Sequence, residues 1–380
     1  MKKILKGFGY PEVVWVPKGE RSFLSFICLS FIIAMFLTPY PQYAMWAGFV
    51  FAAYAAIAND SIQTIGTFIA SNQDKKWWVL WIFIGGIFFF TMFYSWTTFG
   101  GDVSHGRLTS KGFEIAPTKF HFLQIAAPIF LLILTRLRMP VSTTFILLTS
   151  FAATPAAVGG VLAKSMSGYI LSFLMGLFFF LIVAKASKKY FTGKAKFGWT
   201  IAQWITSGTL WSVWLMQDAA NIAVYLPRSL NTGEFIGFTS IVVIGLGLLL
   251  YYKGGRIQKI VTEKSVVTDV RFATLIDLIY CVILFYFKLH SKVPMSTTWV
   301  FIGLLAGREL GMAIMKTGNN NIFHALKLGL KDMTYALLGL VISIAIAIGV
   351  NDQLSVSSMF ETIPQEFVAG IVKFFSKLGI

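Results

Sequence analysis

The feature that most constrains this chain is a series of apolar runs, each about as long as a bilayer is thick. They recur along all 380 residues, and only 13% of residues are charged, against about 25% in a soluble domain. A helix of about 20 apolar residues crosses the hydrocarbon core. We therefore predict an all-α polytopic membrane protein, and we exclude a soluble enzyme and a disordered protein. Five runs are predicted spans: Ser22–Thr38, Trp77–Thr97, Ile170–Ala184, Phe235–Tyr252 and Thr334–Val350.

Four further apolar runs contain polar residues in mid-run. They are Ala44–Ser71, Phe122–Ala153, Ile201–Leu226 and Phe272–Ala306. Irregular backbone at membrane depth is tolerated only where it is buried in protein or lines a watery cavity. These runs therefore predict broken transmembrane helices around such a cavity.

Two motifs occur twice, in the same order. Ala58–Gln63 (Ala-Asn-Asp-Ser-Ile-Gln) pairs with Met216–Asn221 (Met-Gln-Asp-Ala-Ala-Asn), and Met139–Thr144 (Met-Pro-Val-Ser-Thr-Thr) pairs with Val293–Thr298 (Val-Pro-Met-Ser-Thr-Thr). The first pair is offset by 158 residues and the second by 154. Both matches together indicate an internal duplication.

The duplication divides the chain into five parts. Residues 1–42 form an N-terminal cytoplasmic segment with an extra transmembrane helix; 43–184 are the first repeat; 185–198 are a basic cytoplasmic linker; 199–350 are the second repeat; 351–380 are a C-terminal tail with an amphipathic helix.

Basic residues predict the orientation in the membrane. Segments 1–21, 185–197 and 253–271 each hold five Lys or Arg, which favours the cytoplasmic side. The net charge of +16 is explained in this way, without nucleic acid. Residues 39–42 and 101–121 then lie outside, and the two halves start on opposite sides. We therefore predict an inverted-topology repeat, a plan found in many secondary transporters.

The acidic motifs predict a cation site. Asp60 and Asp218 lie inside apolar runs, where a carboxylate is costly and normally functional. Each follows an amide residue, Asn59 or Gln217, and precedes another by three residues, Gln63 or Asn221. Carboxylate and amide oxygens are hard ligands that suit Na⁺ or a comparable cation.

The hydroxyl motifs predict an anion site. In each, a proline is followed by Ser-Thr-Thr, which places free N–H groups and three hydroxyls at the start of a helix. Two such helix ends from inverted halves are expected to meet across one oxyanion such as phosphate. Hydroxyls also cap helices for structural reasons, so one motif alone is weak evidence.

These residues resemble the inorganic phosphate transporter family, which is sodium-dependent in many members. The family has two Gly-Ala-Asn-Asp-x-x-Asn signatures, each followed by a Pro-Val-Ser-Thr-Thr segment that opens the second arm of a re-entrant hairpin. The chain departs from them in several places: Ile57 and Leu215 replace the leading Gly, and Gln63 and Gln217 replace Asn. The resemblance implies two re-entrant helical hairpins, a homodimer, and symport of phosphate with Na⁺ or H⁺, with no other cofactor.

Carried over by position, the resemblance implies the residues of both sites. The cation-binding residues are Asn59, Asp60, Gln63, Gln217, Asp218 and Asn221. The anion-binding residues are Ser142, Thr143, Thr144, Ser296, Thr297 and Thr298, together with Asp60 and Asp218. We expect an integral, multi-pass protein of a bacterial or archaeal inner membrane.

Several alternatives stay open. Sulfate is one: a carboxylate accepts a hydrogen bond from protonated phosphate and repels sulfate, so phosphate is favoured only if Asp60 or Asp218 touches the anion. A passive anion channel is another, although it needs no cation site. An intramembrane hydrolase with Ser142 or Ser296 as nucleophile lacks a base within the membrane.

Other charged residues have two interpretations. Basic residues precede both hydroxyl motifs and either anchor helix ends at the membrane surface or form a vestibule that attracts the anion. They are Arg136, Arg138, Lys288, His290 and Lys292. Arg308 either ends a helix beside Glu309 or belongs to a gate. Asp277 is a third acid at membrane depth, and we expect it to relay protons or to pair with a lysine.

Overall fold

The computed structural model describes residues 18–109, 112–137, 139, 141–252, 269–317, 321–352 and 354–377. These residues form helices, turns and loops, and no β-strand occurs among them. Arg138, Pro140 and the basic segment 253–268 lie outside the described residues, as does segment 1–17.

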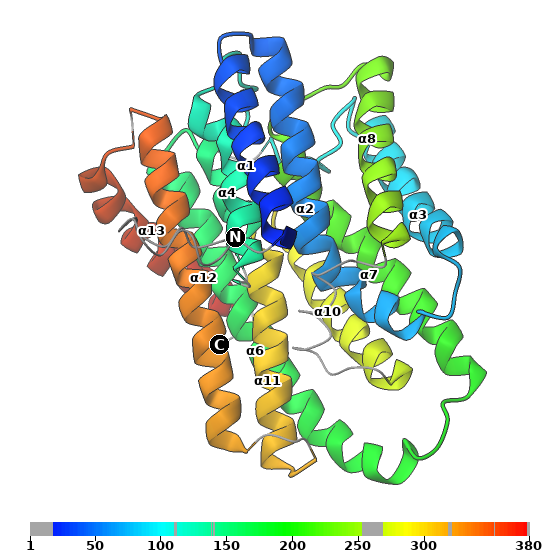
Figure 1. Cartoon of the computed structure of the whole chain (residues 1–380). Coiled ribbons are helices and arrows are strands. Elements are labelled where there is room, and N and C mark those ends of the chain that lie inside the picture. Colours follow the sequence, from blue (N-terminus) through cyan, green and yellow to red (C-terminus); the bar gives the residue numbers. More distant parts are fainter. Residues whose placement is uncertain are drawn as a thin grey trace, which may run out of the picture.

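The helices follow one another along the whole chain (Figure 1). Their bounds are α1 (Lys18–Leu37), α2 (Pro41–Ser71), α3 (Trp77–Thr98), α4 (Phe122–Arg136), α5 (Thr143–Ile146), the 3₁₀ turn η2 (Leu148–Phe151), α6 (Pro155–Tyr190), α7 (Phe197–Ala223), α8 (Thr232–Tyr251), α10 (Val270–His290), α11 (Thr297–Ile314), α12 (Ile322–Val350) and α13 (Val356–Lys377).

Six helices in the described part of the chain are long and apolar enough to cross a membrane. Their apolar windows are Glu20–Leu37, Trp77–Thr98, Pro155–Ala186, Thr232–Tyr251, Val270–His290 and Ile322–Val350. The outward faces are apolar as well: on α3, Phe90 is 70% exposed while Phe88 is buried. Apolar side chains on the outside and polar ones in the centre suit a lipid solvent. The chain is therefore a multi-pass, all-α membrane protein.

The acidic runs are continuous helices, and the expectation of irregular backbone at Asp60 and Asp218 is wrong. Asp60 lies within the 31 residues of α2, and Asp218 lies one turn before the end of α7. Side chains from other helices satisfy these carboxyls, so the backbone has no need to unwind. Helices instead break at the hydroxyl motifs, between α4 and α5 and between α10 and α11. Within the predicted linker 185–198, α6 continues to Tyr190 and α7 begins at Phe197.

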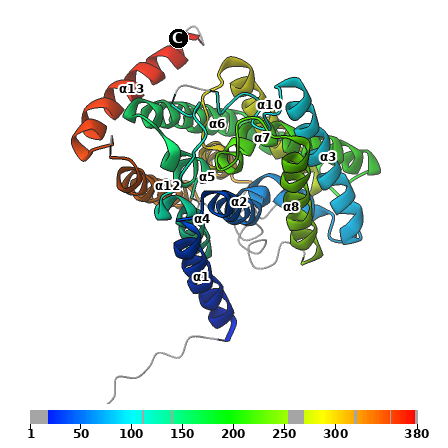
Figure 2. The same cartoon turned by 90° about the horizontal axis from the view of Figure 1, so that it is seen from above.

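Helices at equivalent places in the two halves of the sequence pack in matching ways. The α2–α4 contact corresponds to the α7–α10 contact, and the α2–α8 contact corresponds to the α7–α3 contact. Likewise, α6 packs on α11, and α12 packs on α5 and η2. α2 also contacts α7, and α3 contacts α8. Seen from above, α3 and α8 lie at one edge of the bundle and α12 and α13 at the other (Figure 2).

The segment from α4 to η2 begins and ends in one place. Its start at His121 and its end at Ala152 and Ala153 line the same surface pocket. The Ala153 N–H donates to the Gly112 carbonyl of the preceding loop at 3.1 Å, and the Asn351 amide donates to the Ala152 carbonyl. The chain thus returns to its point of entry after α5.

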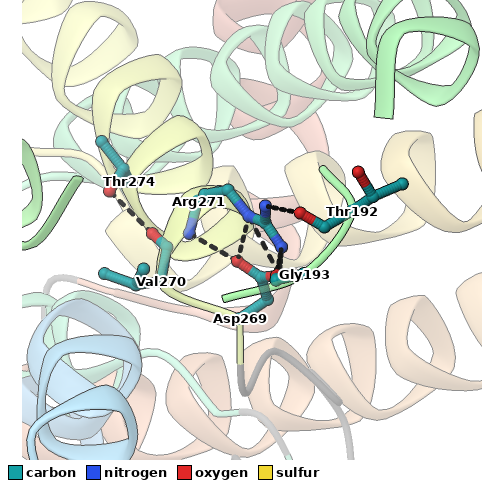
Figure 3. A network of polar contacts seen from close by, with 6 residues as sticks. All are labelled: Thr192, Gly193, Asp269, Val270, Arg271 and Thr274. Carbon is teal, nitrogen blue, oxygen red and sulfur yellow. Dashed lines mark hydrogen bonds and ion pairs between the residues drawn. The ribbon is translucent and has the colours of Figure 1, made fainter. Parts of the chain in front are cut away.

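The start of α10 is fixed to the loop that follows α6 (Figure 3). Asp269 caps α10 and pairs with Arg271 at 2.6 Å, and the Arg271 guanidinium donates to the carbonyls of Thr192 and Gly193. The hydrogen bonds from Arg271 lower the pKa of Asp269 below its usual range. Stability from this pair is therefore present at neutral pH and is lost as the pH falls through that lowered pKa.

Glycines allow α11 to lie directly on the backbone of α6. A Cβ added at Gly307 would lie 2.1 Å from the Phe173 carbonyl oxygen, and one at Gly303 would lie 2.5 Å from that of Tyr169. Small residues at four-residue spacing give this close approach in membranes. α13 packs along α6 in turn, with Glu366 beside Gly159. It lies within the predicted C-terminal tail 351–380 and packs against protein along α6.

We predict that Gly307→Ala lowers the free energy of unfolding by about 1–3 kcal/mol, because the new methyl group meets backbone atoms that cannot move aside. The midpoint of thermal unfolding in detergent measures this. Gly86→Ala on α3 is the matched control, since nothing lies within 4 Å of a Cβ there. Equal midpoints for both variants would contradict the close α6–α11 contact.

Candidate functional site

The two acidic motifs and the two hydroxyl motifs meet in the interior. Asp60 on α2 is 1% exposed and Asp218 on α7 is 4% exposed. Ser142, Thr143 and Thr144 at the start of α5 are buried beside them, as are Ser296, Thr297 and Thr298 at the start of α11. Four segments far apart in the sequence therefore form one buried polar centre.

Asp60 is held by side chains from its own helix and from α5. The Thr143 hydroxyl donates to Asp60 Oδ2, and the Asn59 amide donates to Oδ1 at 2.7 Å. Asn59 also donates to the Val141 carbonyl at 2.8 Å, which fixes the segment before α5 against α2. Gln63 is half-buried and lies farther out, with its amide 3.5 Å from Oδ1.

Asp218 is bound in a similar way from the other half. The Asn221 amide donates to Asp218 Oδ1 at 2.5 Å and also reaches the hydroxyls of Thr143 at 3.0 Å and Thr144 at 3.1 Å. Thr143 thus joins Asp60 of the first half to Asn221 of the second. Through this hydroxyl the two acidic motifs share one hydrogen-bond network.

The second hydroxyl motif packs against the first. Ser296 caps α11 through the Trp299 N–H, as Ser142 caps α5 through the Phe145 N–H. Thr297 accepts from the Trp214 indole at 3.1 Å, and the Thr144 hydroxyl donates to the Met295 carbonyl at 3.1 Å. Thr297 and Thr298 lie beside the carboxyls of Asp218 and Asp60, respectively.

The two hydroxyl-bearing helices differ in length, which the near-identical motifs did not reveal. α11 has 18 residues and presents a full helix N-terminus, whereas α5 has four residues and continues into a 3₁₀ turn. A macrodipole needs several aligned peptide units. The first motif therefore contributes hydroxyls, and the dipole at this centre comes from α11.

Three oxygen atoms of the second acidic motif suit a cation. Gln217 Oε1, Asp218 Oδ2 and Asn221 Oδ1 are buried, and none has a hydrogen-bond partner among the described residues. The Gln217 amide donates to the Leu284 carbonyl, which orients its side chain toward α10. Hard cations such as Na⁺ bind oxygen ligands. A buried oxygen that accepts no hydrogen bond is available as such a ligand. A cluster of His, Cys, Asp or Glu for a transition metal is not found in the described residues.

Two buried cations that sequence reasoning missed lie next to this centre. Arg107, from the loop between α3 and α4, donates to the Met216 carbonyl at 2.7 Å and reaches the Val293 carbonyl, and its charge acts on Asp218. Lys164 on α6 donates to the carbonyls of Ser291 and Val293. Arg107 lies in a polar loop that gave no sign of burial. Lys164 was detectable as the lone charge of an apolar run.

Two of the charged residues noted in the sequence, Arg136 and Arg308, form their ion pairs outside this centre. The Lys292 carbonyl, in contrast, accepts from Arg107 at 3.4 Å. Arg136 ends α4 and pairs with Glu20 of α1 at 2.6 Å, so it anchors a helix end. Arg308 is buried on α11, 6.0 Å over the Phe180 ring and 3.5 Å from Glu309. Both therefore serve helix packing.

Comparisons of the chain with family models, with curated proteins and with solved structures gave no match.

We predict that Thr143→Val lowers the free energy of unfolding by about 1–3 kcal/mol, because it removes the hydroxyl partner of two buried polar groups. Thr143→Ser keeps the hydroxyl and should stay within about 1 kcal/mol of the parent. Thermal unfolding in detergent compares the two, with the exposed Thr97→Val as control. A Thr143→Val midpoint equal to that of Thr97→Val would contradict the bridging role.

Proposed function

We propose that this protein is a secondary active transporter that carries inorganic phosphate across the membrane together with Na⁺. The observation that carries the proposal is the Thr143 hydroxyl, which bonds to Asp60 and accepts from Asn221. It brings the cation-type residues of both halves into contact with an anion-type motif. A coupled carrier needs both kinds of site in mutual contact, whereas a passive channel does not.

An inverted repeat with two re-entrant hairpins is part of the proposal. The matched packing of equivalent helices supports a pseudo-twofold relation between the halves. The shared pocket at both ends of the α4–η2 segment supports the first hairpin. The second is supported by α10, which starts at the loop after α6, and by α11, whose Gly311 packs beside Leu177 and Phe180 of α6. Broken helices at the centre of such repeats hold substrates in many transporters.

The anion is proposed to lie between the hydroxyls of the two motifs and the cation Arg107. Hydroxyls donate to phosphate oxygens, and an arginine provides a charge-assisted, planar donor. The carboxyls in the same centre accept hydrogen bonds from protonated phosphate oxygens, which sulfate lacks near neutral pH. This chemistry supports phosphate over sulfate.

The cation is proposed to lie at the second acidic motif. Asp218 and Asn221 stand one turn apart on α7 and each present a buried oxygen without a donor. When Na⁺ is bound there, its charge lowers the cost of placing an anion beside a carboxylate. Each ion then favours binding of the other, which is the thermodynamic basis of symport.

The first test is uptake by proteoliposomes of labelled phosphate and labelled sulfate, each under a Na⁺, K⁺ or proton gradient. We expect phosphate to accumulate when Na⁺ is inwardly directed. Asp60→Asn and Asp218→Asn should each lower the initial rate at least tenfold. Asp218→Asn removes the charge that binds the cation, and Asp60→Asn removes a carboxylate that accepts from protonated phosphate. Asp352→Asn, outside the centre, should transport normally. Full uptake without any ion gradient, or by either central variant, would refute the proposal.

A second prediction concerns Arg107. Arg107→Gln should raise the phosphate Kd roughly tenfold or more, the effect of losing a charged hydrogen bond of about 1.5–3 kcal/mol. Calorimetric titration of the purified protein with phosphate in Na⁺ measures this. Arg136→Gln removes an equal charge from the α1–α4 ion pair and should leave the Kd unchanged. If both variants bind phosphate like the parent, Arg107 is not part of the anion site.

A further inference from the structure

A third buried carboxyl lies on the helices that carry the central acids. Asp277 on α10 is 1% exposed. The Thr67 hydroxyl of α2 donates to its Oδ1 at 2.9 Å, and the Ser207 hydroxyl of α7 donates to its Oδ2 at 2.5 Å. Thr67 stands seven residues after Asp60, about two helical turns away. Asp277 therefore lies along α2 beyond the central site, toward the end of that helix.

Polar side chains continue from Asp277 to the end of α2. Asp60, Thr64, Thr67 and Ser71 recur at helical spacing and share one face of α2. The Gln203 amide of α7 donates to Ser71, and Asn72 donates to Gln203 at 3.1 Å. The next residues, Gln73–Lys76, are exposed. Polar side chains thus lie at intervals on one face of α2 from Asp60 to the exposed α2–α3 turn.

The equivalent positions on the other side of the centre carry two aromatic residues and a leucine, and none carries an acid. By the repeat offsets, Thr67 corresponds to Tyr225, Ser207 to Phe49 and Asp277 to Leu123. Tyr225 packs so closely on Gly48 that a Cβ there would lie 2.4 Å from its ring, and its hydroxyl donates to the Gln124 carbonyl at 2.7 Å. Phe49 and Tyr225 are both fully buried. The duplication therefore kept the helices and placed the carboxyl on one side only.

The surroundings of Asp277 suit the exchange of a proton. In the part of the chain that the structure describes, its partners are the two hydroxyls, and no lysine or arginine forms an ion pair with it. The titratable neighbour is the Cys281 thiol, one turn further along α10. Asp60 and Asp218 are the next acids, on α2 and α7. A buried carboxyl without a permanent counter-charge can bind and release a proton with little rearrangement, and such groups form relays in membrane transporters.

We propose that Asp277, with Thr67 and Ser207, is a proton-binding station between the central site and the surface at which α2 ends. Its carboxylate takes up one proton from the protonated anion at the central site, becomes the carboxylic acid, and then releases that proton to the water reached through Ser71 and Asn72. The inference rests on the proposed function in one respect: the proton moves with the transported anion. The proposed station adds a proton to the ions that are coupled in transport. It also means that only one side of the central site has a proton-binding carboxyl.

The first experiment follows phosphate and protons together in proteoliposomes. Labelled phosphate reports uptake, and a trapped pH dye reports proton movement at a fixed Na⁺ gradient. In Asp277→Asn, the rate of proton movement should fall at least tenfold relative to the parent, while phosphate–phosphate exchange continues. Asp277→Glu should restore part of the proton movement, and Cys281→Ser should move protons like the parent. Proton movement in Asp277→Asn equal to the parent's, at equal phosphate uptake, would overturn the proposal.

The second measurement does not depend on transport. Infrared difference spectra of the purified protein in lipid, taken between high and low pH, report carboxylic acid carbonyl bands. We expect a band that appears at low pH and is missing in Asp277→Asn but present in Asp332→Asn. If the two variants give identical spectra, Asp277 does not exchange protons. If the parent takes up no phosphate, the proposed function fails, while the spectra still decide whether Asp277 binds a proton.

Discussion

The structure depends on how two carboxyl groups are kept in the interior of a membrane protein. A buried carboxylate is tolerated only when donors or cations surround it, and here a single hydroxyl, that of Thr143, serves the acid of one half and the amide of the other. That sharing fixes α5 between α2 and α7. The start of α5 and the two acidic helices are consequently parts of one arrangement and cannot be altered separately.

Much of this arrangement could be predicted from the sequence, because repeated motifs carry both position and chemistry. The apolar runs predicted membrane-spanning helices. The motif offsets of 158 and 154 residues identified pairs of segments that are neighbours in the structure. The prediction failed where hydrogen bonds decide the backbone. Asp60 and Asp218 seemed to require broken helices, yet their partners come from other segments and both helices run through.

Other features were beyond the reach of sequence patterns. Arg107 comes from a polar loop, and only the tertiary fold carries it to the centre. The four-residue length of α5 against the 18 residues of α11 also follows from packing, since the motifs that start them are nearly the same. Asp277 was visible as an acid at membrane depth, but its hydroxyl partners lie 210 and 70 residues away in the chain.

The crossed packing of the arms has a mechanical consequence. α11 belongs to the second half and lies on α6 of the first, while α5 and η2 of the first half lie on α12 of the second. Each half of the sequence therefore packs a long helix against a hydroxyl-bearing segment of the other. A shift of α6 carries α11 with it through the glycine contacts. In the proposed carrier, the two entrances would be linked through this packing, and opening both at once would require the α6–α11 contact to come apart.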